Sequence, residues 1–399
     1  SGLGAVPLLC TVPVLKYSRM CLYEHCLQVL TERGGLDGGL PERNDRNRQE
    51  MEMFLDSVDQ GFGGAVTVKY YEERVLLDVL KESGACPGLD GLSAHDTAEM
   101  SRVRLCAYPS GRTVGGSMWK VTHNASEILY VTAASLRKDG ILDGCGGSLA
   151  LLGEGHPLLL LDSASFSTQP GIRPPGGGGA PKAKPGSKRE DAVLGTVIPP
   201  VLETLRRQGN VLLPVDAGGR ILELLYGLNK YWAENQGMKQ YPLVFLSNMG
   251  PHLKAYAQCQ LEWTSDAACR GFYAGHPNPF NFNEVSFFGS VREMELHCSA
   301  RDQASGRPSP KVVIATDSTL SHGLSKELLI KWGGDPRNSI MMTDYPAPGS
   351  LAAEVVSVCS TGAPCILNLT RLQRVVLSAS ELEELEKEKE LVRALEEEK

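Results

Sequence analysis

The sequence lacks any long apolar run. No stretch of its 399 residues reaches the roughly 18 consecutive apolar residues that a membrane helix requires, so we expect no membrane association. The apolar opening from Leu3 to Leu15 is interrupted by Pro7 and Pro13 and follows no basic residue, which makes it a poor signal peptide. The pattern predicts instead a buried strand over Leu8 to Val14, followed by a helix that Ser18 would cap.

The sequence also lacks closely paired cysteines. Its eleven cysteines form no C-x-x-C pair, and the nearest two are Cys21 and Cys26. An odd, scattered set of cysteines in a large chain is typical of reduced thiols, which predicts an intracellular protein rather than a disulfide framework.

Local catalytic motifs are absent as well. There is no G-x-x-x-x-G-K-[ST], no G-x-S-x-G and no H-E-x-x-H, which excludes the most easily identified phosphate, acyl-transfer and zinc-protease sites. The eight histidines never fall two, three or four residues apart, so no local pair has metal-ligand spacing. His25 and Cys26 are adjacent, and neighbouring residues on a helix point away from each other. A triad assembled across the fold remains open.

The charge is unevenly placed. Of the net charge of −7, the final segment 381–399 contributes −5, with nine acidic and four basic residues, and the rest of the chain is close to neutral. Bulk electrostatics therefore does not indicate a nucleic-acid-binding protein. Ser380 and Glu383 form a capping box that predicts a helix running to the end of the chain.

The first half of the chain predicts a sheet with hairpins. After a short helix around residues 51–58, three segments have the alternation or apolar content of strands, at residues 103–107, 118–121 and 128–131, and an apolar strand follows at 157–162. The segment 170–189 then breaks the pattern, because eleven of its twenty residues are Gly or Pro, five are Lys or Arg, and none is acidic. Such a composition predicts a mobile loop.

The second half alternates strands with helices. The apolar strand candidates are residues 211–215, 243–246, 311–316 and 339–343, and the helix candidates between and around them are 199–207, a helix from Arg220, 251–263 and 325–332. Apolar strands separated by helices predict a parallel sheet covered by helices on both faces. The stretch from Gly209 to Leu224 is the strongest local feature, a strand, a tight turn at Gly218-Gly219 and a helix.

That strand–turn–helix resembles the start of the β-CASP domain, the cap inserted into metallo-β-lactamase-fold nucleases. Further segments match the family in order: residues 11–14 and 114–120 in the lactamase part, then N-P-F-N-F at 278–282, S-P-K-V-V-I-A at 309–315, 323–325, Trp332, 335–340 and 348–352 in the cap. The resemblance implies an α/β chain with a metallo-β-lactamase sandwich, incomplete here, and an inserted β-CASP domain built on a parallel sheet flanked by helices. It covers most of the chain, with insertions near 84–100 and 170–189.

The resemblance implies four parts. They are a metallo-β-lactamase-like domain at 1–165 without its N-terminal motifs, a flexible basic Gly/Pro-rich linker at 166–195, a β-CASP domain at 196–355, and a return segment with an acidic C-terminal helix at 356–399.

Active members of this family cut a phosphodiester with two zinc ions held by His and Asp. Where they carry a histidine ligand before the Val-Gly-Gly segment, this sequence has Arg112, which cannot donate a lone pair to zinc. Where they carry an aspartate in a Y-x-x-D pattern, it has Ala133. Asp162 retains an acidic position, and Asp216 matches inactive members better than nucleases. The resemblance thus predicts a pseudo-nuclease with no catalytic residue, no bound metal and no other cofactor.

The members that the sequence resembles most are inactive subunits of the assembly that cleaves and polyadenylates pre-mRNA 3′ ends. This implies a nuclear protein that pairs with a homologous β-CASP endonuclease subunit, a symplekin-type scaffold, other 3′-end processing factors and pre-mRNA. Five basic residues in the 170–189 segment are weak candidates for RNA contact: Arg173, Lys182, Lys184, Lys188 and Arg189. Two alternatives stay open, an active zinc-dependent β-CASP ribonuclease and the inactive β-CASP subunit of the Integrator complex.

Overall fold

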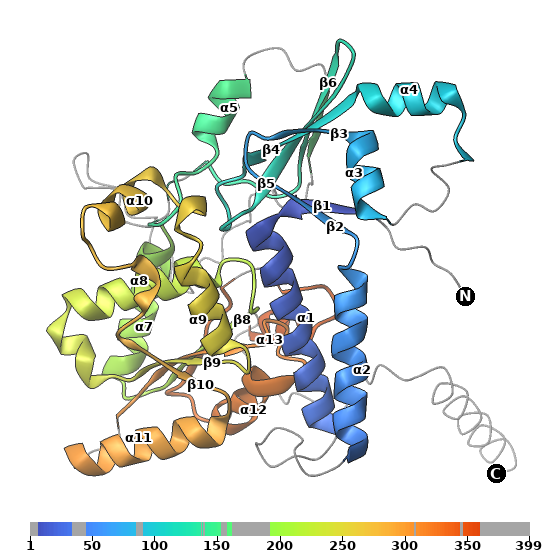
Figure 1. The fold of residues 1–399 in the computed structure, drawn as a ribbon. Coiled ribbons are helices and arrows are strands. Elements are labelled where there is room, and N and C mark those ends of the chain that lie inside the picture. Colours follow the sequence, from blue (N-terminus) through green and yellow to red (C-terminus); the bar gives the residue numbers. More distant parts are fainter. Residues whose placement is uncertain are drawn as a thin grey trace, which may run out of the picture.

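A computed structural model describes residues 7–33, 45–84, 91–136, 138, 140–152, 158–161, 192–306, 309–343 and 346–359. In this part of the chain the strands form three sheets, a parallel pair, a mixed five-stranded sheet and a parallel five-stranded sheet. The mixed sheet lies at the top of Figure 1 and the second five-stranded sheet at the lower left, and helix α1 runs from one toward the other. No helix among the described residues is long and apolar enough to cross a membrane.

The chain begins with β1 (Leu8–Thr11), which leads directly into the long helix α1 (Val12–Arg33). The strand predicted over Leu8 to Val14 is therefore too long, and the helix starts well before Ser18. Pro13 caused the error, because a proline usually indicates an extended segment. In the first turn of a helix, however, a proline is tolerated, since the N–H that it lacks would have no helical partner there. Helix α2 (Asp45–Gly61) packs beside α1, and β2 (Ala65–Val68) pairs in parallel with β1 (Figure 1).

The mixed sheet confirms the strands expected in the first half. Its order is β3 (Glu73–Val75), β4 (Val103–Pro109), β5 (Ser117–His123), β6 (Ser126–Val131) and β7 (Leu158–Leu161). All neighbours are antiparallel except β6 and β7. The β5–β6 hairpin turns at Asn124, which has a φ of 53°. Three helices flank this sheet: α3 (Leu76–Ser83), α4 (Ala94–Arg102) and α5 (Gly146–Leu152).

The second five-stranded sheet is wholly parallel, as predicted. Its order is β10 (Val285–Phe288), β9 (Leu243–Leu246), β11 (Val312–Thr316), β8 (Val211–Val215) and β12 (Ser339–Ile340). Strands β8 and β9 have the predicted bounds. Strand β10 was not predicted, and β12 is shorter than the expected 339–343.

Helices cover both faces of the parallel sheet. They are α7 (Ala192–Arg206), α8 (Ile221–Glu234), α9 (Gly250–Gln258), α11 (Val291–Ser305), α12 (Gly323–Trp332) and α13 (Leu351–Cys359), whereas α10 (Asp266–Tyr273) packs against η3 and buries none of its residues. Three short 3-10 helices join them: η2 (Gln236–Gln240), η3 (Leu261–Trp263) and η4 (Pro279–Asn281). The helix predicted over 251–263 is in fact α9 followed by η3.

Alternate residues of each strand serve two different cores. Along β8, Leu213 packs in the core formed with α7, α8 and α9, whereas Leu212 packs in the core formed with α11, α12 and α13. Both residues are fully buried. A strand with apolar side chains on both faces needs cover on both, which is why the sequence shows continuous apolar runs here rather than an alternation.

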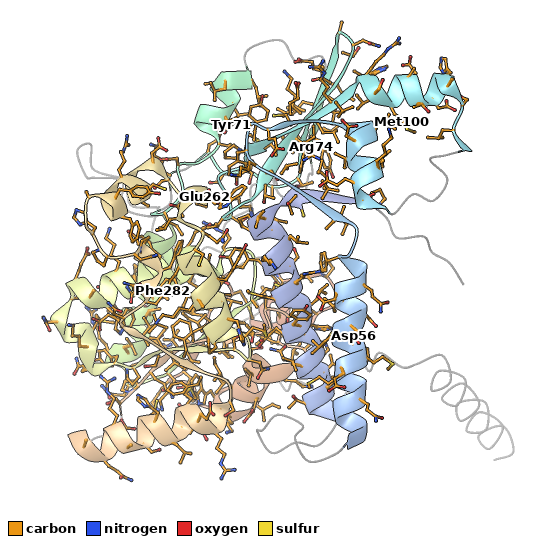
Figure 2. The ribbon with its side chains drawn as sticks, in the orientation of Figure 1. Asp56, Tyr71, Arg74, Met100, Glu262 and Phe282 are labelled. Atoms are coloured by element: carbon orange, nitrogen blue, oxygen red, sulfur yellow. The ribbon has the colours of Figure 1, made fainter. Side chains whose placement is uncertain are left out.

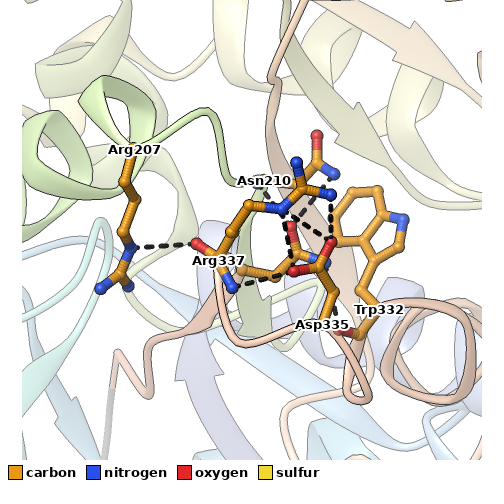
Figure 3. A network of polar contacts seen from close by, with 6 residues as sticks. Arg207, Asn210, Trp332, Asp335 and Arg337 are labelled. Atoms are coloured by element: carbon orange, nitrogen blue, oxygen red, sulfur yellow. Dashed lines mark hydrogen bonds and ion pairs between the residues drawn. The ribbon is translucent and has the colours of Figure 1, made fainter.

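A close backbone contact closes the amino end of this sheet. A Cβ at Gly209 would lie 1.7 Å from the carbonyl oxygen of Arg337, so only glycine fits. Around it, Arg207 Nε donates to that carbonyl, and Asn338 Oδ1 accepts from the backbone N–H of Asn210. Figure 3 shows these hydrogen bonds together with the ion pair between Asp335 and the Arg337 guanidinium. It secures the start of β8 against the loop that enters β12.

Candidate functional site

The loop between β4 and β5 lies between the two sheet-containing parts. Gly115, with a φ of +79°, approaches β1 and the start of α1 so closely that a Cβ there would lie 2.6 Å from Cβ of Pro13. Thr11 Oγ1 donates to the Gly115 carbonyl at 2.6 Å. Val114 packs in the same core as Tyr17 and Val215, so the loop belongs to the core of the parallel-sheet part as well.

A second loop continues this contact. The backbone N–H of Ser265 donates to the carbonyl of Ile141 at 2.7 Å, and the N–H of Asp266 donates to Oδ2 of Asp143. The rings of Tyr70 and Trp263 meet edge to face 4.8 Å apart. We call the contact of loops 110–116 and 141–145 and helix α1 with the parallel-sheet part the interdomain seam. Tyr71 and Glu262 are labelled on its two sides in Figure 2.

The structure places Arg112, one of the two predicted ligand positions, in a loop of this seam and Ala133, the other, in a loop bonded to it. Ser135 donates its backbone N–H to the carbonyl of Ser110 at 2.9 Å, so the loops that carry the two positions are joined. Gly111 rests on the backbone at Gly144, where a Cβ would lie only 2.3 Å away. Arg112 and Ala133 are both half-buried. The chemistry at these positions is a guanidinium and a methyl group, neither of which offers a lone pair to a metal.

Of the other predicted residues, Asp216 lies within the part of the chain that the structure describes. Asp216 follows β8 at the carboxyl edge of the parallel sheet, and its Oδ1 accepts from the backbone N–H of Ser318 at 3.2 Å. Asp162 and the five basic candidates of the 170–189 segment lie outside the described residues, as do the linker core and the acidic tail. Within the described ranges, no group of three or more His, Cys, Asp and Glu residues could hold a metal ion.

Helix α1 contributes Glu24 to the seam, and its carboxylate accepts five hydrogen bonds. Glu24 is 3% exposed, and its carboxylate is the group that makes these bonds. It accepts hydrogen bonds from three side chains and two backbone N–H groups of the following residues: Gln28, Ser247, Asn248, Met249 and Thr316. These partners come from α1 itself, from the loop after β9 and from the end of β11.

Helix α1 also carries a half-buried free thiol, that of Cys21, against the same sheet edge. A Cβ at Gly218, in the turn after β8, would lie 2.7 Å from Sγ of Cys21. Burial, together with the negative charge of Asp216, raises the pKa of Cys21 to about 12. Such a thiol is almost entirely protonated at neutral pH, so it is a poor nucleophile and a poor metal ligand.

Family models match both parts of the chain. A metallo-beta-lactamase superfamily domain matches residues 2–158, and a Beta-Casp domain matches residues 221–355. The chain therefore combines a metallo-β-lactamase superfamily domain with a Beta-Casp domain. The first match contains strands β1 to β6 with helices α1 and α2, and the second contains strands β9 to β12. We call the parallel sheet the β-CASP sheet for this reason.

Several curated relatives align along most of the chain. A protein of Drosophila melanogaster named "Probable cleavage and polyadenylation specificity factor subunit 2" is 29% identical over 381 residues, which is 95% of this chain and 42% of that protein. An Arabidopsis thaliana protein named "Cleavage and polyadenylation specificity factor subunit 2" is 26% identical over 390 residues, 97% of this chain and 43% of that protein. The Schizosaccharomyces pombe protein "Endoribonuclease ysh1" is 25% identical over 287 residues, 72% of this chain and 33% of that protein. The chain spans about two fifths of the length of the relatives named subunit 2.

Sequence reasoning missed Glu24 and its partners. Glu24 is 223 residues from Ser247 and 292 residues from Thr316 along the chain, so no local spacing connects them. The one available signal is a charged residue within an otherwise uncharged face of a helix, and that signal alone does not identify its partners.

Proposed function

We propose that the chain is the metallo-β-lactamase/β-CASP region of a non-catalytic subunit of the nuclear complex that cleaves and polyadenylates pre-mRNA 3′ ends. In this proposal it pairs with a homologous β-CASP endonuclease and, with a symplekin-type scaffold and other processing factors, supports cleavage of pre-mRNA by that partner. The names of the relatives support the assignment to the complex.

The observation that carries the non-catalytic role is the pair Arg112 and Ala133. Zinc-dependent hydrolysis requires ligands with lone pairs around an ion that activates water. The two positions where the family resemblance expects a histidine and an aspartate lie on hydrogen-bonded neighbouring loops and carry a guanidinium and a methyl group. A guanidinium at a metal position also places a fixed positive charge there, which repels a cation.

A second candidate is an active zinc-dependent ribonuclease. The similarity to the proteins named endoribonuclease ysh1 and YSH1, at 25% and 24% identity, favours it. The two hypotheses differ in metal content, because an active site of this class must retain zinc.

The deciding experiment uses the full-length protein purified from nuclei, with its homologous endonuclease as the positive control. We expect polyadenylation factors to co-purify, zinc to be far below stoichiometric, and RNA cleavage to be absent unless the endonuclease is added. Stoichiometric zinc with metal-dependent cutting by the isolated protein contradicts the non-catalytic role. Recovery of Integrator subunits in place of polyadenylation factors contradicts the assignment to this complex.

A further inference from the structure

The topology of the β-CASP sheet predicts a crevice at its carboxyl edge between β9 and β11. The chain leaves β9 toward α9, on the face that also holds α7 and α8, but leaves β11 toward α12 on the opposite face. In an open parallel sheet, neighbouring strands whose connections depart to opposite faces leave a crevice at their carboxyl ends, and ligands of such sheets bind there. The crevice is built from residues 247–249 after β9 and from Thr316 at the end of β11.

In this protein the crevice is occupied by Glu24 of the other domain. Glu24 Oε1 accepts from the backbone N–H of Asn248 at 3.1 Å and from Thr316 Oγ1 at 2.5 Å. Its Oε2 accepts from the backbone N–H of Met249 at 2.8 Å and from Ser247 Oγ at 3.1 Å. Each carboxylate oxygen therefore reaches the loop after β9.

Removing the Glu24 carboxylate would leave buried hydrogen-bond donors without an acceptor, which costs free energy. Ser247 and Thr316 are at most 1% exposed, so water does not replace a missing bond at these hydroxyls. The backbone N–H groups of Asn248 and Met249 stand directly before α9, where the helix dipole favours a negative charge. Met249, the N-cap residue of α9, makes no side-chain cap bond of its own.

Residues one turn before and one turn after Glu24 on the same face of α1 also contact the β-CASP domain. Cys21, three residues earlier, lies against Gly218, and Gln28, four residues later, lies against Gly323. A Cβ at Gly323 would lie 2.4 Å from Cδ of Gln28. Residues three and four apart share one side of a helix, so Glu24 is the centre of a continuous docking face.

We propose that Glu24 is an internal ligand of the β9/β11 crevice and that its carboxylate locks the metallo-β-lactamase domain onto the β-CASP domain. The crevice is then closed to an external anion, and the two domains move as one body. Glu24 is a positioning residue in this role. The inference does not depend on the proposed function, since it concerns contacts within the chain.

The test compares the wild-type protein with Glu24→Ala and Glu24→Gln. The matched control is Glu203→Gln, which makes the same chemical change at an exposed glutamate of α7. Two local readouts are used, hydrogen exchange at the amides of Asn248 and Met249, and the rate of Cys21 alkylation followed by mass spectrometry. Exchange at Leu213 in β8 reports on global unfolding.

For Glu24→Ala we expect the exchange of the two amides and the alkylation of Cys21 to accelerate at least tenfold, with exchange at Leu213 unchanged. If α1 separates from the β-CASP domain, the Cys21 thiol becomes exposed and its pKa returns toward the ordinary value of a thiol. The alkylation rate of Cys21 therefore reports on whether Glu24 holds the two domains together. Glu24→Gln should give a smaller acceleration in the same direction, because its amide keeps one acceptor oxygen but turns an N–H₂ toward other donors. Glu203→Gln should match the wild type.

Two results would overturn the proposal. One is local exchange and alkylation in both Glu24 variants that equal those of the wild type. The other is an acceleration at Leu213 as large as that at Asn248 and Met249, which would make Glu24 a general stability residue rather than a lock between domains. If Glu24→Ala does not fold, the comparison of Glu24→Gln with Glu203→Gln decides the question by the same criteria.

Discussion

Replacing Gly218 by alanine tests the docking of α1 on the β-CASP turn by steric means alone. The new Cβ would lie 2.7 Å from Sγ of Cys21, whereas the next contacts, to Tyr17, are at 3.6 and 3.9 Å and are ordinary. The carbon and sulfur atoms would overlap by about 1 Å relative to normal van der Waals contact, so α1 or the thiol must move.

The expected cost follows from two opposing effects. Overpacking of a closely packed contact destabilises by about 1–3 kcal/mol. Against this, alanine restricts the unfolded chain and stabilises by about 0.4–1 kcal/mol where the native backbone accepts it. The backbone at Gly218 is not left-handed, so we expect Gly218→Ala to lower the free energy of unfolding by about 1–2 kcal/mol.

The diagnostic measurement is the same substitution in a Cys21→Ala background. Removing the sulfur removes the overlap, so Gly218→Ala should then be neutral or stabilising by up to about 1 kcal/mol. Gly219→Ala serves as the matched control, because Gly219 has a φ of +66° and an open space around it. Its cost of about 1–2 kcal/mol comes from the backbone, and Cys21→Ala should leave it unchanged.

The free energies of unfolding of six proteins, the wild type, the three single variants and the two double variants that carry Cys21→Ala, are obtained from urea titrations. A cost of Gly218→Ala that is equal in the presence and absence of the Cys21 sulfur would refute the reasoning, since the overlap would then not be its source. A rescue of Gly219→Ala by Cys21→Ala would refute it equally, because it would show that the thiol acts on the whole turn.

Two further predictions concern the amino end of the β-CASP sheet. Gly209→Ala, which places a Cβ against the rigid backbone carbonyl of Arg337, should cost about 3 kcal/mol or more in a urea titration, and no side-chain truncation nearby should restore it. The Arg337 side chain holds the pKa of Asp335 at about 2, so the stabilisation from this pair is complete above the ordinary carboxyl pKa and is lost as the pH falls from about 4 toward 2. Arg337→Ala should raise the pKa of Asp335 toward 3.8 in a carboxyl NMR titration, and an unchanged titration would contradict the pairing.

Much of the β-CASP domain could be predicted from local patterns. Strands β8 and β9 have the expected bounds because each is a short apolar run between turn residues. Strand β10 escaped prediction because Ser286 interrupts its apolar run and only Val285 is fully buried. The start of α1 was misplaced because Pro13 suggests an extended segment, whereas the first turn of a helix accepts it.

The sequence by itself determined the alternation of strands and helices in the second half of the chain and the residue types at the two candidate ligand positions, since both depend on local pattern and on side-chain chemistry. Only the tertiary structure decided which residues meet at the interdomain seam. Glu24 and Thr316 are 292 residues apart, and a single carboxylate on a helix carries no information about its partners. Partners so distant are selected by the packing of two complete domains, in which a glycine at Gly218 lets α1 approach closely enough for the carboxylate to reach the crevice.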